Sequence, residues 1–244
     1  DDPNLINGKA QNPFSAIKSK PLPIIAIGAS AGGLDALRGF FYNMPPDINL
    51  SFVVIQHLDP QHKSIMKDLL EKYTKMVVFE AKDGMVVEPN CIYLNPPNTN
   101  MAILDGTLQL IQLPKTHPLN LPINYFFRSL ASDQAEYAIG IVLSGTGSDG
   151  TLGVKAITDA GGMVMVQEEK QAQYDGMPRN AINTGLVDYI LTVEKMPVEL
   201  VKYVQHPYSN SPEKTGVAKQ SGQNYFKKIF IIKKPLLTSS AISK

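Results

Sequence analysis

Three polar side chains of the kinds that make a serine hydrolase follow three apolar segments of the sequence. Ser30 lies in the motif GASAGG after the first segment, His57 follows the second, and Asp149 lies in SGTGSDG after the third. A serine hydroxyl is a weak nucleophile until a base takes its proton, and the imidazole needs a carboxylate that fixes its tautomer. These residues therefore predict acyl transfer, with Ser30 as nucleophile, His57 as base and Asp149 as orienting carboxylate.

Each of the three residues also has a purely structural explanation. Ser30 could cap a helix within a glycine turn, His57 could hydrogen-bond the backbone at a strand end, and Asp149 could cap the helix that follows it. Their joint placement favours a site. The chain order Ser, His, Asp also differs from that of α/β-hydrolases, chymotrypsin and subtilisin, which indicates a different esterase fold.

Short apolar runs alternate with helical patterns along the chain, which predicts an α/β fold. We expect a doubly wound, mostly parallel sheet with helices on both faces, and a local antiparallel hairpin around Asp105-Gly106. Ligands of such sheets bind outside the carboxyl ends of the strands, where the three residues should meet. The expected strands are 23–28, 51–56, 77–79, 91–94, 138–143, 163–166 and 188–191, with helices at 34–41, 65–70, 123–130 and 152–160.

Composition limits the classes of protein to which the chain could belong. The formal net charge is +1, which argues against a nucleic-acid binder, and Cys91 is the only cysteine, so no intrachain disulfide can form. The sequence has neither an apolar leader nor a run of 18 apolar residues, so we expect a cytoplasmic protein without direct membrane insertion. We expect a polar linker at 1–22, a catalytic domain at 23–206, and at 207–244 a linker that could lead into a following domain.

The residue types also allow two other kinds of site. The glycine turn also resembles that of short-chain dehydrogenases, but no tyrosine has a lysine four residues later, and Gln56-His57 stands where a ribose-binding acid should be. The four histidines, His57, His62, His117 and His206, have no spacing typical of a metal site. No cofactor and no metal is therefore predicted.

Longer stretches make the assignment more specific: IGASAGGLDAL, FVVIQHLDPQH, DGMVVEPNCIYLNPP, FFRSLA, IGIVLSGTGSDGTLG, AGGMVMVQ and YDGMPRNAINTGLVD. Over roughly residues 22 to 205 the sequence resembles the catalytic domain of the chemotaxis protein-glutamate methylesterase family (CheB type). The resemblance implies hydrolysis of γ-glutamyl methyl esters on the cytoplasmic helices of methylated chemoreceptors, and deamidation of certain glutamines there. By position, Ser30 matches the family's nucleophile, His57 its base and Asp149 its orienting carboxylate.

Four further residues are candidates for the oxyanion and substrate rim. Ala31 and Thr146 flank the expected oxyanion hole, where the stand-alone enzymes often carry Thr and Met. Met177 and Arg179 lie in a block that resembles the family, and Arg179 could pair with acidic residues near the ester. The alternative, that this block is a turn plus the start of a helix with Arg179 solvated, remains open.

The motifs QHLDPQH and SGTGSDG resemble those of the family branch that is fused to a methyltransferase (CheR type) and to sensor-kinase modules. This resemblance implies fused or associated modules of these kinds as partners. Only about 22 residues precede the first expected strand, so we expect no control by a phosphorylated receiver domain. A second hypothesis is a catalytically silent, methylesterase-like binding or scaffold module in a multidomain signalling protein.

Overall fold

The computed structural model describes residues 22–57, 66–112 and 120–205. The chain divides into one unit of residues 1–201, which contains the sheets, and another of residues 202–244. Almost all of the expected N-terminal linker, and the whole of 207–244, lie outside the described residues.

A parallel sheet forms the centre of the fold. In the described part of the chain it has seven strands in the order β10-β9-β8-β1-β2-β5-β3, and every neighbouring pair is parallel. The strands are β1 (Ile24–Ala29), β2 (Ser51–Gln56), β3 (Val77–Glu80), β5 (Cys91–Leu94), β8 (Ile139–Val142), β9 (Met163–Gln167) and β10 (Tyr189–Leu191). Five of them, β1, β2, β5, β8 and β9, are buried along their whole length, as strands covered on both faces must be.

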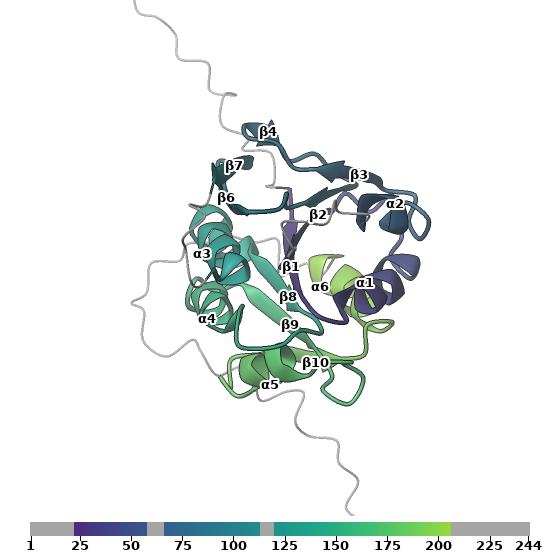
Figure 1. Cartoon of the computed structure of the whole chain (residues 1–244), viewed down its shortest axis with the longest axis vertical. Coiled ribbons are helices and arrows are strands. Elements are labelled where there is room, and N and C mark those ends of the chain that lie inside the picture. The colour runs from purple at the N-terminus through teal and green to yellow at the C-terminus, as the bar shows by residue number, and fades with distance from the viewer. Residues whose placement is uncertain (1–21, 58–65, 113–119, 206–244) are drawn as a thin grey trace, which may run out of the picture. The chain divides into compact units, whose positions relative to one another are not determined.

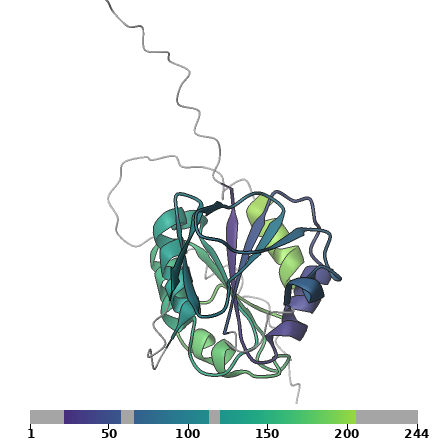
Figure 2. The ribbon, with the colours of Figure 1, turned by 45° about the horizontal axis from the view of Figure 1, so that its top comes forward.

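Helices cover both faces of this sheet. Figures 1 and 2 show α3 and α4 on one side of the strands and α1 and α6 on the other. The helices are α1 (Gly33–Tyr42), α2 (Met66–Leu70), α3 (Pro122–Gln134), α4 (Thr151–Asp159), α5 (Gly176–Ile182) and α6 (Met196–Gln205), with a 3-10 turn at Ala135–Tyr137. The expected doubly wound α/β fold is confirmed. Of these helices, α6 was not expected from the sequence, and α5 corresponds to the alternative that the block with Met177 and Arg179 is a turn plus the start of a helix.

Helix α3 shows why the sequence makes a helix there. Pro122 begins it, where the missing N–H costs nothing, and Ile123, Phe126, Phe127 and Leu130 recur at helical spacing and are buried. This stripe packs over the sheet and belongs to a buried apolar cluster that includes residues of β1, β2, β8 and β9. The burial of that stripe fixes the position of the first turn of α3, which contributes to the site described below.

The expected hairpin is present as part of a separate small sheet. Strands β6 (Thr99–Leu104) and β7 (Thr107–Gln112) pair antiparallel around Asp105 and Gly106, and β4 (Met85–Val86) adds a third strand beside β7. Asp105 and Gly106 have φ angles of 49° and 70°, which are the positive values that a two-residue hairpin turn of the primed type requires.

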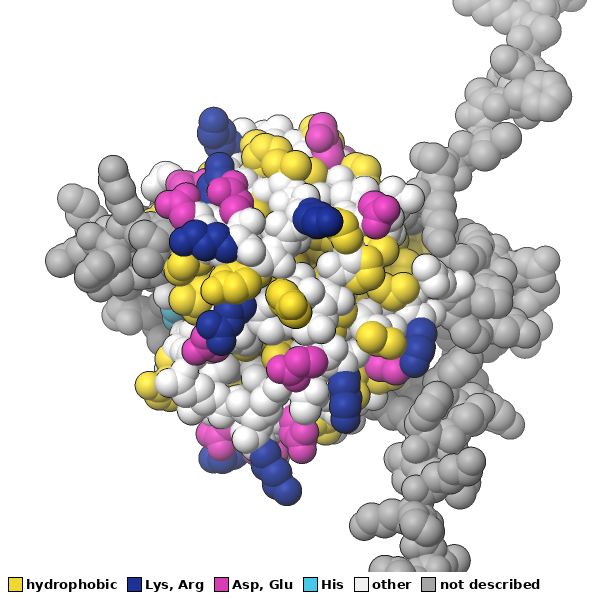
Figure 3. All heavy atoms as spheres, turned by 90° about the vertical axis from the view of Figure 1, so that its right-hand side faces the viewer, with side chains coloured by type: hydrophobic (Ala, Val, Ile, Leu, Met, Phe, Trp, Pro, Cys, Tyr) yellow, Lys and Arg dark blue, Asp and Glu magenta, His cyan; other side chains and the backbone are white. Residues whose placement is uncertain are grey.

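The face on the right of Figure 1 is mixed in character. Figure 3 shows acidic and basic side chains interspersed among apolar ones on it, with no broad area of one charge, in agreement with the net charge of +1. Among the described residues, no helix has both the length and the apolar character needed to cross a bilayer.

Tyr93 on β5 carries a buried phenol. Its side chain is 1% exposed, and its hydroxyl accepts a hydrogen bond from the N–H of Glu88 at 2.8 Å. The same hydroxyl donates to the carbonyl of Val86 at 3.4 Å. Burial disfavours the charged phenolate and raises the pKa of Tyr93 to about 12.

This phenol makes the stability of the fold depend on alkaline pH. An unfolded tyrosine ionises near about pH 10, whereas folded Tyr93 keeps its proton to about pH 12. Between these values the folded state binds more protons than the unfolded state, so this contribution is complete below pH ~10 and the free energy of unfolding then falls by about 1.4 kcal/mol per pH unit. Tyr93→Phe should remove this dependence of the free energy of unfolding on alkaline pH. At neutral pH its free energy of unfolding should already be about 1–3 kcal/mol lower than that of the wild-type protein, because the Glu88 N–H loses its partner.

Urea unfolding at intervals between pH 8 and 12 measures both effects. Tyr42→Phe is the matched control, because Tyr42 is 74% exposed and the change should leave the profile unaltered. Equal alkaline slopes for the wild-type protein and Tyr93→Phe would contradict the assignment.

Candidate active site

The three sequence-predicted residues follow three adjacent strands. Ser30 directly follows β1, the central one, His57 directly follows β2 on one side of it, and Asp149 lies in the loop after β8 on the other side. The strand order runs in opposite directions on the two sides of β1, so this edge is the topological switch point where doubly wound sheets bind ligands. The sheet therefore brings the loops that carry Ser30, His57 and Asp149 to one edge.

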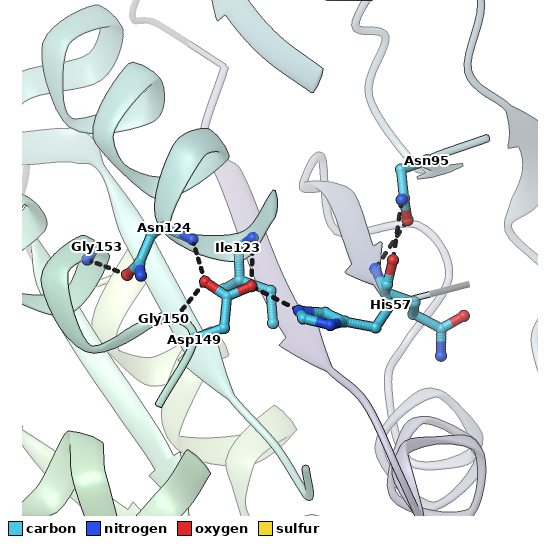
Figure 4. Close-up of polar contacts among 8 residues, drawn as sticks. His57, Asn95, Ile123, Asn124, Asp149, Gly150 and Gly153 are labelled. Carbon is cyan, nitrogen blue, oxygen red and sulfur yellow. Dashed lines mark hydrogen bonds and ion pairs between the residues drawn. The ribbon is translucent and has the colours of Figure 1, made fainter. Parts of the chain in front are cut away.

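His57 and Asp149 are joined directly. The distance from His57 Nε2 to Asp149 Oδ2 is 2.7 Å, and the close-up in Figure 4 shows the carboxylate facing the ring. The Asp149 side chain is 2% exposed, whereas that of His57 is 38% exposed. With Nε2 donating to the carboxylate, the ring keeps Nδ1 as its proton acceptor.

The Asp149 carboxylate is saturated with donors. Oδ2 also accepts from the N–H of Ile123 at 3.0 Å, and Oδ1 accepts from the N–H groups of Asn124 and Gly150, both at 2.9 Å. Ile123 and Asn124 lie in the first turn of α3, where unpaired N–H groups and the helix dipole favour an anion. Asp149 therefore caps α3, a neighbouring helix, and not only the start of α4, which follows it.

Asn124 in turn caps the N-terminus of α4. Its Oδ1 accepts from the N–H of Gly153 in the first turn of α4 at 2.8 Å, and its side chain is buried. The cap residues of α3 and α4, Leu121 and Gly150, provide no side-chain hydrogen bond themselves. The N-terminus of α3 is thus capped by Asp149 from the loop before α4, and that of α4 by Asn124 from the first turn of α3, with Asp149 between the two helices (Figure 4).

Ser30 sits in a turn held from two sides. Its N–H donates to the carbonyl of Ser144 at 2.9 Å, and its carbonyl accepts from the N–H of Gly33 at 2.8 Å. The turn passes through Gly32 at φ 69°, a conformation that side chains with a Cβ rarely adopt. In the described part of the chain the Ser30 hydroxyl makes no hydrogen bond to the His57 ring.

A buried hydroxyl ties this turn to its neighbours. Ser144 Oγ lies 2.8 Å from the carbonyl of Ala31, and it accepts from the N–H of Tyr174 at 3.0 Å. Gln167 in turn holds the N–H of Ser144 at 2.8 Å through its side-chain oxygen. Because Ser144 is 1% exposed, these bonds are shielded from water and fix the three loops relative to one another.

Two of the expected rim positions, Ala31 and Thr146, lie on the loops that form the Ser30 turn and its neighbour. In the part of the chain that the structure describes, the N–H groups of Ala31 and Thr146 donate no hydrogen bond. Gly145, which precedes Thr146, packs so closely that a Cβ added there would come within 2.9 Å of Ser30 Cβ. The two expected rim positions therefore lie on loops that meet at Ser30.

The other two expected rim residues are placed differently from one another. Met177 is fully buried and packs beneath Gly145, so it supports the loop and is not exposed to a ligand. Arg179 on α5 is exposed and binds two acidic side chains of this chain, Glu169 at 3.0 Å and Asp175. These two partners raise the pKa of Arg179.

Sequence reasoning assigned no role to Asn95, which lies at the same edge of the sheet. The side chain of Asn95 is buried and makes two hydrogen bonds to the backbone of Gln56, the residue before His57. The available signal was its position directly after the buried strand β5, at the same edge as the other three residues. Among the described residues, no group of three or more His, Cys, Asp or Glu side chains could hold a metal ion.

The mutual capping of α3 and α4 predicts a measurable stability. Asn124→Ala removes the acceptor of the buried Gly153 N–H but keeps the backbone bond to Asp149, so the free energy of unfolding should fall by about 1–2 kcal/mol. Asn43→Ala is the control, because its side chain bonds the carbonyl of Gly39 on an exposed surface and should cost no more than about 0.5 kcal/mol. Chemical unfolding measures both losses in free energy. Equal losses for the two variants would show that the buried Asn124 bond stabilises the fold no more than the exposed Asn43 bond does.

Comparison with known proteins identifies the family to which the chain belongs. The sequence model of the family described as CheB methylesterase matches residues 25–200. A protein-glutamate methylesterase/protein-glutamine glutaminase of Pyrococcus horikoshii is 32% identical over 74% of this chain and 50% of its own length. One of Trichodesmium erythraeum is 32% identical over 75% of this chain and 53% of its own. The chain thus spans about half the length of these curated relatives.

A larger relative and a solved structure extend the comparison. An uncharacterised 104.1 kDa protein of Rhodobacter capsulatus is 41% identical over 57% of this chain, which corresponds to 14% of that protein. The crystal structure of the Thermotoga maritima CheB methylesterase catalytic domain superposes with a TM-score of 0.69 at 28% identity, covering 75% of this chain and all of that one. From the family match, the related sequences and the shared fold it follows that this chain belongs to the CheB methylesterase family.

Proposed function

We propose that this chain is a serine hydrolase that removes methyl groups from glutamyl methyl esters on the cytoplasmic helices of chemoreceptors. The observation that carries the proposal is the 2.7 Å pair of His57 and buried Asp149 at the switch point, where Ser30 directly follows the central strand β1. Relatives that carry the name protein-glutamate methylesterase/protein-glutamine glutaminase supply the substrate class.

In the proposed reaction the Ser30 hydroxyl attacks the ester carbonyl while Nδ1 of His57 takes its proton. Asp149 remains a carboxylate and stabilises the imidazolium that forms. The protonated ring then gives its proton to the leaving methoxide, so methanol departs and an acyl-serine ester remains. Water attacks that ester with His57 again as the base, which regenerates Ser30 and releases a glutamate side chain.

The negative charge of the tetrahedral intermediate needs donors that do not have to reorganise. The N–H of Ser30 is already bound to the Ser144 carbonyl, so it is not free for this role. The N–H groups of Ala31 and Thr146 are the donors we assign to it. The assignment needs backbone groups alone, so it does not depend on the side chains at these two positions.

The same groups would act on a glutamine side chain, with ammonia as the leaving group in place of methanol, so we include deamidation in the proposal. A cytoplasmic location, and fused or associated methyltransferase and sensor-kinase modules, remain predictions from the sequence. The 104.1 kDa relative, of which the matched region is 14%, is an example of such a sequence within a much longer protein.

The alternative, a methylesterase-like module that binds without turnover, is favoured by one observation. The Ser30 hydroxyl makes no hydrogen bond to His57 in the described part of the chain, as would be expected if the pair were not used. Catalytic hydrogen bonds are often long without substrate and tighten in the substrate complex, so we prefer the hydrolase.

Methanol release from a methylated chemoreceptor fragment tests the choice. Ser30→Ala should abolish release and also labelling by a fluorophosphonate, which requires an activated serine. Asp149→Asn should lower kcat by as much as about 10⁴-fold, because the imidazole tautomer is no longer fixed. The wild-type protein is therefore expected to be labelled and to release methanol.

Two exposed residues provide matched controls. Ser148→Ala changes an exposed serine of the same loop as Asp149, and Asp159→Asn changes an exposed aspartate at the far end of α4. Both variants should retain wild-type rates. A wild-type protein that folds, binds the receptor fragment and yet neither labels nor releases methanol would establish the binding module instead.

A further inference from the structure

We propose that Asn95 is the positioning residue for His57: its side-chain amide holds the end of β2 from which the base projects. The inference rests on the proposed function and extends it by naming what fixes the base from the backbone side, opposite to Asp149.

The need for such a residue follows from how β2 and β5 pair. The two strands are parallel in the register Val54 with Leu94, and the N–H of Asn95 donates to the carbonyl of Val54 at 3.2 Å. In a parallel ladder the next bonds would join the N–H of Gln56 to the carbonyl of residue 95, and the carbonyl of Gln56 to the N–H of residue 97. Residue 97 is proline, which has no N–H to give.

The side chain of Asn95 supplies both of the missing bonds. Its Oδ1 accepts from the N–H of Gln56 at 2.8 Å, and its Nδ2 donates to the carbonyl of Gln56 at 3.0 Å. Asn95 is 5% exposed and Gln56 is 7% exposed, so water does not compete well for either bond. One amide therefore takes the place of a strand neighbour at the last residue of β2.

His57 depends on this clamp because the second bond is to the carbonyl of the peptide that joins Gln56 to His57. On the other side, the pairing of β2 with β1 runs as far as Gln56 with Ala29. Asn95 thus supports the end of β2 on the side of β5, as β1 does on the other side, and Figure 4 shows its two bonds to the backbone beside His57. A base displaced by about 1 Å can lose on the order of 100-fold in rate, so a shift of this peptide should be seen in catalysis.

Two substitutions separate positioning from folding. Asn95→Asp keeps the acceptor for the Gln56 N–H but sets a carboxylate oxygen against the Gln56 carbonyl, and Asn95→Ala removes both bonds. Asn90→Asp is the matched control: Asn90 flanks the other end of β5, and its Oδ1 accepts from the N–H of Asn49 at 2.8 Å, a bond that aspartate retains.

Turnover gives the first readout. Asn95→Asp should lower kcat by about 100-fold with KM changed by less than about twofold, because the substrate does not touch Asn95, while Asn90→Asp should match the wild-type protein. Combined with Asp149→Asn, the Asn95 substitution should add little further loss, because both residues act through the same ring.

The proton on His57 Nε2 gives a second readout that does not require turnover. In the wild-type protein its bond to Asp149 should give a downfield proton resonance, which should shift or broaden in Asn95→Asp and Asn95→Ala and stay in place in Asn90→Asp. If the resonance shifts in the Asn95 variants but the wild-type protein shows no hydrolysis, the positioning role is supported and the proposed function is rejected. Unchanged kcat and an unchanged resonance in Asn95→Asp would overturn the inference. If Asn95→Ala does not fold, Asn95→Asp alone provides the test.

Discussion

A carboxylate taken out of water must be surrounded by donors, and the arrangement around Asp149 follows from that requirement. Its two oxygens accept from the backbone of Ile123, Asn124 and Gly150, and from the ring of His57. An unpaired buried charge would cost several kcal/mol, so the first turn of α3, the start of α4 and the end of β2 are all held near this one group. The stability of the edge and the orientation of the imidazole therefore have the same origin.

Uncharged groups hold the loop that carries Ser30 at the same edge of the sheet. Ser144 links the Ser30 turn to the loop that begins α5, and Gly145 leaves no room for a side chain between Ser30 and Met177. The Ser30 turn is thus held by the buried Ser144 hydroxyl and by close packing against Gly145, whereas the His57 ring is held by the carboxylate of Asp149. A side chain at Gly32 or Gly145 would meet neighbouring atoms within 3 Å, so the small residues of the two glycine-rich motifs are needed for the loops to approach this closely.

Much of this could be predicted from the sequence, because the determining signals are local. Apolar runs ended by Gly28 or Gln56 indicated buried strands, and Asp105-Gly106 indicated the hairpin. Long matching motifs indicated the family, which is confirmed. The catalytic roles of Ser30, His57 and Asp149 stay predictions, although His57 and Asp149 are in contact.

What the sequence did not reveal depends on contacts between distant segments. Asn95 and Gln56 are 39 residues apart, and Asn124 and Gly153 are 29 apart, so no periodicity marks their bonds. The burial of Met177 likewise depends on the path of α5 under Gly145, and α5 has seven residues, too few for a clear helical pattern.

The His57 ring and the Asp149 carboxylate differ in exposure, and this difference determines which of them solvent can reach. Asp149 is 2% exposed and His57 is 38% exposed, so solvent protons and dissolved reagents reach the imidazole but not the carboxylate. A carbodiimide that couples amines to carboxyl groups should thus leave Asp149 untouched in the folded protein and modify it once α3 and α4 separate. Its protection from chemical modification would report whether this edge of the sheet is closed, independently of any catalysis.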